Sequence, residues 1–319
     1  MRLADLGELG LLAELERRRL VGPIADDAAL LRDGLVVTQD ALVEGIHFRL
    51  DWTSWRDLGY KAAAVNLSDL AASGAEPEGL LVTLSAPGVT SVDDVLELYE
   101  GIAETGVAVV GGDTTDAERV SLGVTALGRS ERVPGRGGAQ AGDLLVVTGP
   151  LGASAAGFHC LRGGWESPLV DAHRRPPLRL DEGRRLARSA HALLDISDGL
   201  AADAGHLSRR SGCRVVIDLE RVPVAAGVAE VASRAGRDVF ELACGFGEDY
   251  ELLAAVADPA GLAVVGHCEE GEGMELRLGG RTVDLRGWEH FSSKNSFQND
   301  DSPTGCAGVR PRLGRRESR

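Results

Sequence analysis

Strand-like and helix-like patterns alternate along most of this chain, and this alternation limits the fold more than any other feature of the sequence. Apolar runs at 28–31 and 35–38 flank Asp33-Gly34, a dipeptide typical of hairpin turns. Later apolar runs are separated by segments with helical spacing. We therefore predict a mixed α/β fold with hairpins, not a purely doubly wound parallel sheet. In the first half, the predicted helices are 55–72 and 91–105, and the further predicted strands are 80–84, 107–110 and 120–127.

A glycine-rich link at 134–142 divides the chain into two halves. The length of 319 residues also favours two domains over one. We expect an N-terminal domain at 1–134, a C-terminal α/β domain at 135–291 and a disordered tail at 292–319, where apolar spacing is almost lost. The second half is predicted to contain a helix from Ala153, a helix at 200–211, and strands at 144–148, 193–196, 215–219, 251–256, 262–265 and 274–278.

The composition indicates a globular enzyme without nucleic-acid or membrane partners. The formal net charge is −15 and no concentrated basic stripe is present, so the surface would repel nucleic-acid backbones and anionic membranes. No apolar stretch is long enough to span a bilayer, and the first twenty residues have the spacing of an amphipathic helix, not of a signal peptide. The five cysteines are scattered without a CxxC pair, which indicates neither a disulfide framework nor a zinc site. We therefore expect a cytoplasmic protein.

Four short acidic motifs lie where predicted strands or helices meet turns. Clustered carboxylates repel one another unless cations hold them, and oxygen ligands at strand ends are typical of Mg²⁺ sites beside phosphates. One such motif alone is most simply a helix N-cap or a hairpin turn, whereas four in one chain favour a Mg²⁺-dependent enzyme that acts on phosphate. The motifs are Asp26-Asp27, Asn66-Leu67-Ser68-Asp69, Gly111-Gly112-Asp113 and Asp195-Ile196-Ser197-Asp198-Gly199.

The common nucleotide-binding motifs are absent. The chain has only two lysines, Lys61 and Lys294, and neither lies in the GxxxxGK(S/T) sequence of a P-loop. The HRDxxxxN loop of protein kinases is missing, and Gly245-Phe246-Gly247 lacks the third glycine of a dinucleotide fingerprint. If the chain binds a nucleotide, another scaffold must hold it.

Seven runs in the sequence resemble those of thiamine-monophosphate kinase, in order and over about residues 20 to 291. That family belongs to an ATP-binding superfamily that includes aminoimidazole ribonucleotide synthetase. DISDGL and GGDTT occur across the superfamily, whereas the EGIHF and GEDYEL runs are more particular to the kinase. The runs are DDAALL (26–31), DALVEGIHF (40–48), GYKAAAVNLSDLAASGA (59–75), GGDTT (111–115), GAQAGDLLVVTGPLG (138–152), DISDGL (195–200) and GEDYELL (247–253).

The resemblance implies ATP-dependent transfer of a phosphoryl group onto thiamine monophosphate, which gives thiamine diphosphate. It implies an aminoimidazole ribonucleotide synthetase-like fold, in which the N-terminal sheets of two copies form a barrel and so build a homodimer. Each active site would lie near the junction of subunits and domains. Mg²⁺ would be the cofactor, with ATP and thiamine monophosphate as substrates.

The resemblance also implies roles for individual residues. No catalytic side chain is expected, because in-line phosphoryl transfer needs positioning and neutralised charge instead of a nucleophile from the protein. The implied Mg²⁺ ligands are Asp27, Asp40, Asp69, Asp113, Asp195 and Asp198, with Thr38 as a lesser one; the ATP contacts are Gly112, Asp113, Arg136 and Ser197; and the thiamine contacts are His47, Glu248 and Trp288.

Two positions depart from the family pattern. Gln39 stands where a hydroxyl residue usually precedes the aspartate, and Phe246 replaces the first glycine of a usual Gly-Gly-Glu-Asp run. Two alternatives stay open: another enzyme of the superfamily, such as aminoimidazole ribonucleotide synthetase, or a maturation factor that binds ATP and Mg²⁺ without catalysis. A hydrogenase maturation factor typically ends in a cysteine, and this sequence ends Glu317-Ser318-Arg319, so the kinase is favoured.

Overall fold

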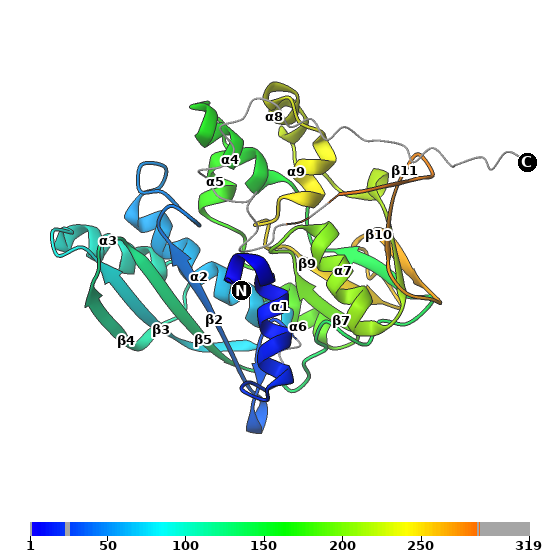
Figure 1. The fold of residues 1–319 in the computed structure, drawn as a ribbon, viewed down its shortest axis with the longest axis horizontal. Helices are drawn as coiled ribbons and strands as arrows, with labels where there is room; N and C mark the ends of the chain where they lie inside the picture. The colour runs from blue at the N-terminus through cyan, green and yellow to red at the C-terminus, as the bar shows by residue number, and fades with distance from the viewer. Residues whose placement is uncertain (1, 23–25, 286, 288–319) are drawn as a thin grey trace, which may run out of the picture.

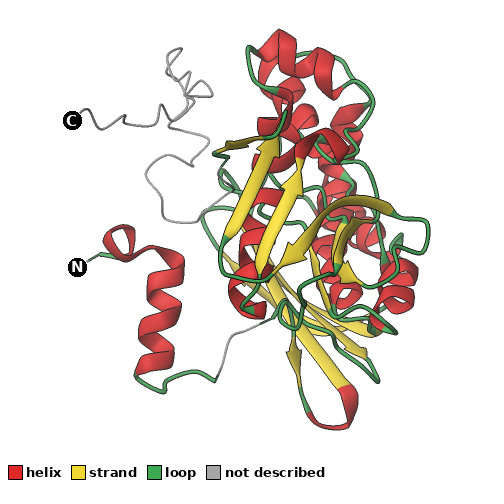
Figure 2. Cartoon of the chain, turned by 90° about the vertical axis from the view of Figure 1, so that its right-hand side faces the viewer, coloured by secondary structure: helices red, strands yellow, loops and turns green. Residues whose placement is uncertain are grey.

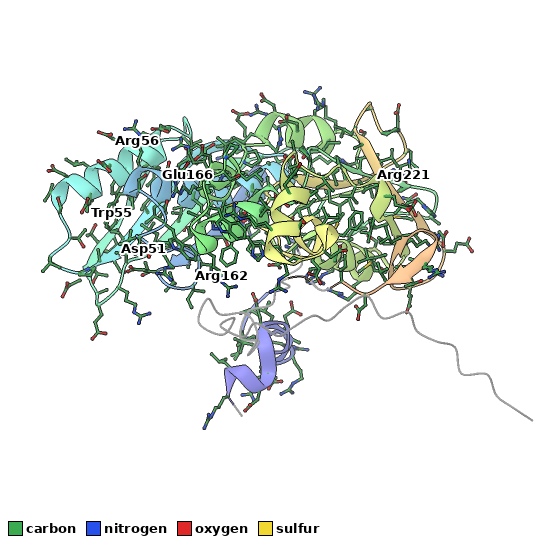
Figure 3. All side chains as sticks on the ribbon, turned by 90° about the horizontal axis from the view of Figure 1, so that it is seen from above. Asp51, Trp55, Arg56, Arg162, Glu166 and Arg221 are labelled. Carbon is green, nitrogen blue, oxygen red and sulfur yellow. The ribbon has the colours of Figure 1, made fainter. Side chains whose placement is uncertain are left out.

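Two β-sheets lie side by side, one before the 134–142 link and one after it, and helices pack against both (Figure 1). The computed structural model describes residues 2–22, 26–285 and 287. Figure 3, seen from above, places Trp55 and Arg221 toward opposite ends of the molecule, one in each half. The mixed α/β architecture with hairpins predicted from the sequence is confirmed.

The first sheet has five strands in the order β1-β2-β5-β3-β4. Neighbouring strands are antiparallel except for β3 and β4, which pair in parallel. Every second residue of β5 is buried, as expected where helices cover one face of the sheet. β4 is an edge strand, and all eight of its residues are exposed. The strands are β1 (Ala29–Leu30), β2 (Leu35–Val43), β3 (Glu76–Ala86), β4 (Val109–Asp116) and β5 (Ser121–Arg129).

The second sheet has seven strands in the order β12-β11-β8-β10-β6-β9-β7. All pairs are antiparallel except β11 with β8. The central strands β6 and β9 are almost wholly buried because helices or neighbouring chain cover both faces. The strands are β6 (Leu144–Val147), β7 (Ala192–Asp195), β8 (Arg214–Asp218), β9 (Leu252–Val256), β10 (Ala263–Glu269), β11 (Met274–Leu278) and β12 (Arg281–Val283).

The helices differ in how closely they pack against the rest of the chain. α1 stands apart from the rest of the described chain in Figure 2, whereas α4, α5, α8 and α9 gather at the top of Figure 1 around a shared apolar cluster. No helix in the described residues is long and apolar enough to cross a bilayer. The helices are α1 (Leu3–Arg17), α2 (Trp55–Ala72), α3 (Val92–Ala103), α4 (Ala153–Gly163), α5 (Leu169–Arg174), α6 (Leu180–Ala187), α7 (Leu200–Ser211), α8 (Val228–Ala235) and α9 (Val239–Gly245).

Helix α2 connects the two halves. Its N-cap is Ser54, whose hydroxyl accepts a hydrogen bond from the Asp57 N–H at 3.0 Å. Most of its residues are buried, so it is packed on several sides. Ala71 and Ala72, in its last turn, share an apolar cluster with Leu193 of β7 in the second half. The end of α2 is therefore fixed against both sheets.

The structure corrects several sequence predictions. We predicted that the strand at 107–110 would stop before Gly111-Gly112, but β4 runs on to Asp116, with Gly112 paired to Val82 of β3. A Cβ at Gly112 would lie 1.9 Å from the Val82 carbonyl oxygen, so glycine at this position lets β4 pair closely with β3. The helices α5, α6, α8 and α9 were not predicted because each has only six to eight residues. The predicted helix at 200–211 is confirmed as α7, and the tail at 292–319 lies outside the described residues.

Candidate active site

Three carboxylates from distant parts of the chain meet where the two halves join. Asp27 precedes β1, Asp69 lies in the last turn of α2, and Asp195 ends β7. One carboxylate oxygen from each lies within 4.8 Å of those of the other two. We call this group the Asp27–Asp69–Asp195 cluster. A set of oxygen donors at this spacing matches the ligands that Mg²⁺ and other hard cations prefer.

Two hydroxyl groups orient the carboxylates of the cluster. Thr38 of β2 donates a hydrogen bond from its Oγ1 to Asp69 Oδ2 at 2.5 Å. Ser68 of α2 donates from its Oγ to Asp195 Oδ2 at 2.7 Å. The second bond crosses from the first half to the second, so the relative position of the halves sets the shape of the cluster.

Burial and mutual repulsion raise the pKa values of the three acids. The pKa of Asp195 rises to about 8, first because the group is buried and then because Asp27 is near. The pKa of Asp69 is well above its ordinary value, owing to burial and to the charges of Asp40, Asp195 and Asp27. Each acid therefore resists ionisation until a cation compensates its charge, which is a second sign that the cluster fits a metal.

Arg136 partly compensates the cluster. Its Nε donates to Asp27 Oδ1 at 2.7 Å, and a second guanidinium nitrogen bonds the same oxygen. Its backbone N–H donates to Asp26 Oδ1 at 2.8 Å. Burial raises the pKa of Asp27, and Arg136 opposes that rise. Arg136 thus lies on the link between the halves with its charge directed at the cluster.

The loop after β7 lies beside the cluster. The Asp198 N–H donates to Asp203 Oδ2 at 3.1 Å, and the Ser197 carbonyl accepts from the Glu248 N–H at 2.8 Å. Asp203 of α7 is buried, and its Oδ1 has no hydrogen-bond partner within the described residues. Burial and the charges of Asp198 and Asp195 keep the pKa of Asp203 well above its usual range. The Ser197–Asp198 loop is therefore fixed from α7 on one side and from the Glu248 turn on the other.

Of the remaining residues predicted to bind metal or ATP, one lies near the Asp27–Asp69–Asp195 cluster and two lie far from it. Asp40 is near, because its charge raises the pKa of both Asp69 and Asp195, and its N–H donates to Asn66 Oδ1 at 2.9 Å. Gly112 and Asp113 are far: they are exposed on β4, at the outer edge of the first sheet (Figure 1), and Asp113 does not belong to the Asp27–Asp69–Asp195 cluster. Within one chain, the structure does not bring these two residues to the cluster.

A pocket shares helix α2 with the cluster, through Lys61 and Asp69, and we call it the histidine pocket. The aromatic rings of Phe48 and Trp52 form part of its wall, and His47 lies in the turn after β2, where its Nδ1 accepts a hydrogen bond from the Val43 N–H at 3.0 Å. The lining residues are His47, Phe48, Arg49, Trp52, Thr53, Leu58, Lys61, Leu161, His173 and Arg174.

Glu248 lies behind two lining residues of the histidine pocket. Its Oε2 is 3.2 Å from Lys61 Nζ and 3.2 Å from His173 Nδ1. Burial alone would raise the pKa of Glu248, but Lys61 and His173 more than offset this and lower it. Tyr250, two residues on, has its pKa raised by burial and by the charges of Glu248, Asp40, Asp195 and Asp69, so these carboxylates lie near it. The predicted thiamine residues His47 and Glu248 thus lie in one region, and Trp288 lies outside the described residues.

Several residues of this region were not singled out from the sequence. Ser68 was noted only as part of a motif, and His173 and Asp203 carried no motif at all. One signal could have drawn attention to Lys61 as a functional residue, namely that lysine occurs only twice in the chain. Asp203 offered another, because it follows Asp198 by five residues at the start of a predicted helix.

Comparison with known proteins identifies the family. The AIR synthase related protein family matches residues 25–130 with its N-terminal domain and 140–284 with its C-terminal domain. The thiamine-monophosphate kinase of Aquifex aeolicus (strain VF5) is 35% identical over 309 residues, which cover 91% of this chain and 100% of that protein. The chain belongs to the thiamine-monophosphate kinase family. Another member of the family, from Mycobacterium tuberculosis (strain ATCC 25618 / H37Rv), is 35% identical over 317 residues, 92% of this chain and 94% of that protein.

Solved structures of the thiamine-monophosphate kinase family share the whole fold. AaThiL complexed with AMPPCP and TMP superposes with a TM-score of 0.85 at 36% identity, covering 91% of this chain and 99% of that one. E. coli HypE, a hydrogenase maturation protein, gives a TM-score of 0.65 at 23% identity, over 87% of this chain and 97% of that one, which shows a common fold alone. The aminoimidazole ribonucleotide synthetase-like fold of the chain is confirmed, and the barrel formed by two N-terminal sheets stays a prediction.

Proposed function

We propose that this chain transfers the γ-phosphoryl group of ATP directly to the phosphate of thiamine monophosphate and so forms thiamine diphosphate. One observation carries the proposal: in a chain of the thiamine-monophosphate kinase family, the Asp27–Asp69–Asp195 cluster and the histidine pocket share helix α2, which carries both Asp69 and Lys61. Two polyanionic substrates need such a site, because without cations their phosphates would repel each other and the carboxylates. AaThiL, which is similar over 91% of this chain, was complexed with AMPPCP and TMP.

The carboxylates would hold Mg²⁺. Asp27, Asp69 and Asp195 have the oxygen donors, the spacing and the suppressed ionisation that fit the ion. We propose Thr38, Asp40, Asp113 and Asp198 as further ligands. When bound, Mg²⁺ would neutralise the charge on the transferred phosphoryl group and on both substrates.

The protein's own groups would position the nucleotide. Arg136 has a guanidinium suited to paired hydrogen bonds with phosphate oxygens, and it is already held at the cluster by Asp27. We propose that Ser197, whose loop is fixed by Asp203 and by the Glu248 turn, contacts ATP with Gly112 and Asp113. The protein supplies no nucleophile, because the attacking atom is an oxygen of the thiamine monophosphate phosphate.

The thiamine substrate would occupy the histidine pocket. His47 lines it, Glu248 contacts two of its lining residues, and Trp52 contributes an aromatic ring to its wall. We propose His47, Glu248 and Trp288 as the contacts to thiamine. The transferred phosphate would then point toward the Asp27–Asp69–Asp195 cluster.

We further propose that the chain works as a homodimer in the cytoplasm, with domains at 1–134 and 135–291. The fully exposed edge strand β4 supports the dimer, because an unpaired edge is a ready surface for a second sheet. In a dimer built by the first sheets, the exposed Gly112 and Asp113 of β4 would contribute to the active site of the second subunit. Four cysteines are buried and free in the described residues, which suits a reducing compartment.

A product assay tests the proposed function. Purified protein with ATP, Mg²⁺ and thiamine monophosphate should give thiamine diphosphate on chromatography. The Asp198→Asn variant should form none while keeping the wild-type circular dichroism and melting temperature. Wild-type turnover by this variant would remove Asp198 from the mechanism, and no thiamine diphosphate from the wild type would refute the proposed function.

A further inference from the structure

The lysine that lines the histidine pocket is almost fully buried. The Lys61 side chain is 6% exposed, and its ammonium group lies 3.2 Å from Glu248 Oε2. A charged group that far from water is tolerated only when it is paired, so Lys61 and Glu248 depend on each other. These residues are 187 positions apart and belong to different halves of the chain.

A third residue lies close to the same carboxylate oxygen. His173 Nδ1 is 3.2 Å from Glu248 Oε2 and 2.9 Å from Ser154 Oγ. Burial, followed by the charge of Lys61, lowers the pKa of His173 to about 3, so the ring is neutral near pH 7. Glu248 is therefore held by one cation on α2, and a neutral ring of α5 lies beside the pair.

The backbone of Glu248 is constrained as well. Its φ is 58°, in the left-handed region that non-glycine residues rarely adopt, and its N–H donates to the Ser197 carbonyl. A Cβ at the preceding Gly247 would lie 2.2 Å from that carbonyl oxygen, so only glycine lets the two loops approach this closely. Backbone strain of this kind persists where surrounding contacts enforce it, and it often marks functional sites.

We propose that Lys61 is a positioning residue for the thiamine substrate: it acts through Glu248 and sets the affinity of the histidine pocket without touching the reacting phosphates. This inference rests on the proposed function. The ion pair lies between the pocket, which Lys61 and His173 line, and the Ser197–Asp198 loop, to which Glu248 is hydrogen-bonded. Lys61 and Asp69 share helix α2, about 12 Å apart along its axis at 1.5 Å per residue, so one rigid element supports both the pocket and the cluster.

The test is a double-mutant cycle on substrate binding. Dissociation constants for thiamine monophosphate are measured by calorimetry for the wild type, Lys61→Met, Glu248→Gln and the double variant. Each single change should weaken binding about tenfold or more, and the double variant should bind about as weakly as Glu248→Gln alone, because Lys61 acts through Glu248. The KM for ATP of Lys61→Met should stay within about threefold of wild type, a split that a general loss of structure would not produce.

A matched control comes from the same helix. Arg56→Met removes another paired cation of α2, but one whose partners are Glu100 and Glu104 and whose side chain is 50% exposed in the outer part of the first half (Figure 3). It should leave the dissociation constant for thiamine monophosphate unchanged. If Lys61→Met does not fold, Lys61→Gln, which keeps a hydrogen-bond donor without the charge, takes its place in the cycle.

The outcomes separate this inference from the proposed function. Three results would overturn the role of Lys61 while wild-type turnover stands. The first is a double variant whose loss of thiamine monophosphate affinity is the product of the two single losses. The others are unchanged binding by Lys61→Met, and equal rises in the KM values for ATP and thiamine monophosphate. A wild type that neither binds thiamine monophosphate nor forms thiamine diphosphate would instead overturn the proposed function, and the inference with it.

Discussion

Individual carboxyl groups at the junction of the halves decide when a cation can bind. Asp195 has a pKa of about 8 in the folded protein, against 3.8 for an unperturbed aspartate. Folding therefore takes up a proton between these values, so the free energy of unfolding of the metal-free protein falls as the pH rises through this window. Mg²⁺ needs the ionised carboxylate and competes with that proton.

The first prediction concerns this competition. The rise in melting temperature caused by Mg²⁺ should be larger at about pH 8 than at about pH 6, because fewer protons must then be displaced. Differential scanning fluorimetry with and without Mg²⁺ at both pH values measures it. In Asp195→Asn the rise should be smaller and should depend less on pH, whereas a rise that is equal at both pH values in the wild type would contradict the assigned role of the cluster.

A second prediction concerns Arg136. Its guanidinium is held at Asp27, where it can pair with nucleotide phosphates, so Arg136→Ala should raise the KM for ATP about tenfold or more. The KM for thiamine monophosphate should change by less than about threefold. Steady-state kinetics with each substrate varied in turn give both values. Equal rises in the two constants would indicate that Arg136 only supports the structure.

At the scale of elements, helix α2 organises the site, and its packing can be tested. A Cβ at the buried Gly59 would lie 1.9 Å from the Leu98 carbonyl oxygen of α3, so Gly59→Ala should force the two helices apart. We expect a loss of about 1–3 kcal/mol in the free energy of unfolding, measured by urea denaturation. Gly22→Ala is the control and should change stability by less than about 0.5 kcal/mol, because, chain neighbours apart, no atom of the described residues lies within 4 Å of the added Cβ. Equal stability of the two variants would refute this account of the α2–α3 contact.

The sequence predicted long, strongly patterned elements well and short ones poorly. Helices α2 and α7 follow from apolar spacing, and their predicted bounds agree with the structure. The strand at 107–110 was predicted to end before the GGDTT run, because paired glycines look like a turn in a single sequence. In β4 these glycines instead allow close contact with the β3 backbone. That use of glycine depends on a neighbouring strand which the local sequence does not reveal.

At the scale of the whole molecule, the site exists only because the two halves meet. Family motifs predicted that Asp27, Asp69 and Asp195 would share a site, and the structure brings their oxygens together. The Lys61–Glu248 pair was not predicted, because the family motifs gave Lys61 no role and no partner. Long-range polar pairs of this kind are decided by how the two sheets pack on α2, which apolar periodicity does not specify.

The proposed homodimer gives a prediction at this scale. Val110 of the edge strand β4 is 59% exposed, so a charge there should block pairing of two first sheets. Val110→Lys should elute as a monomer of 33.5 kDa in size-exclusion chromatography with light scattering, whereas the wild type should show twice that mass. Val89→Lys, at a 94% exposed loop position, should remain dimeric. A wild-type monomer, or a dimeric Val110→Lys variant, would argue against an interface at β4.

The dependence of turnover on Mg²⁺ concentration tests the central claim most directly, namely that cations held by the Asp27–Asp69–Asp195 cluster allow two phosphate substrates to react. Thiamine diphosphate formation is followed at increasing Mg²⁺ for the wild type and for Asp69→Asn. We predict no product in the wild type without a divalent cation, and in Asp69→Asn a Mg²⁺ requirement raised about tenfold or more. Product formation by the wild type in the presence of a chelator, or an unchanged Mg²⁺ requirement in Asp69→Asn, would contradict the account.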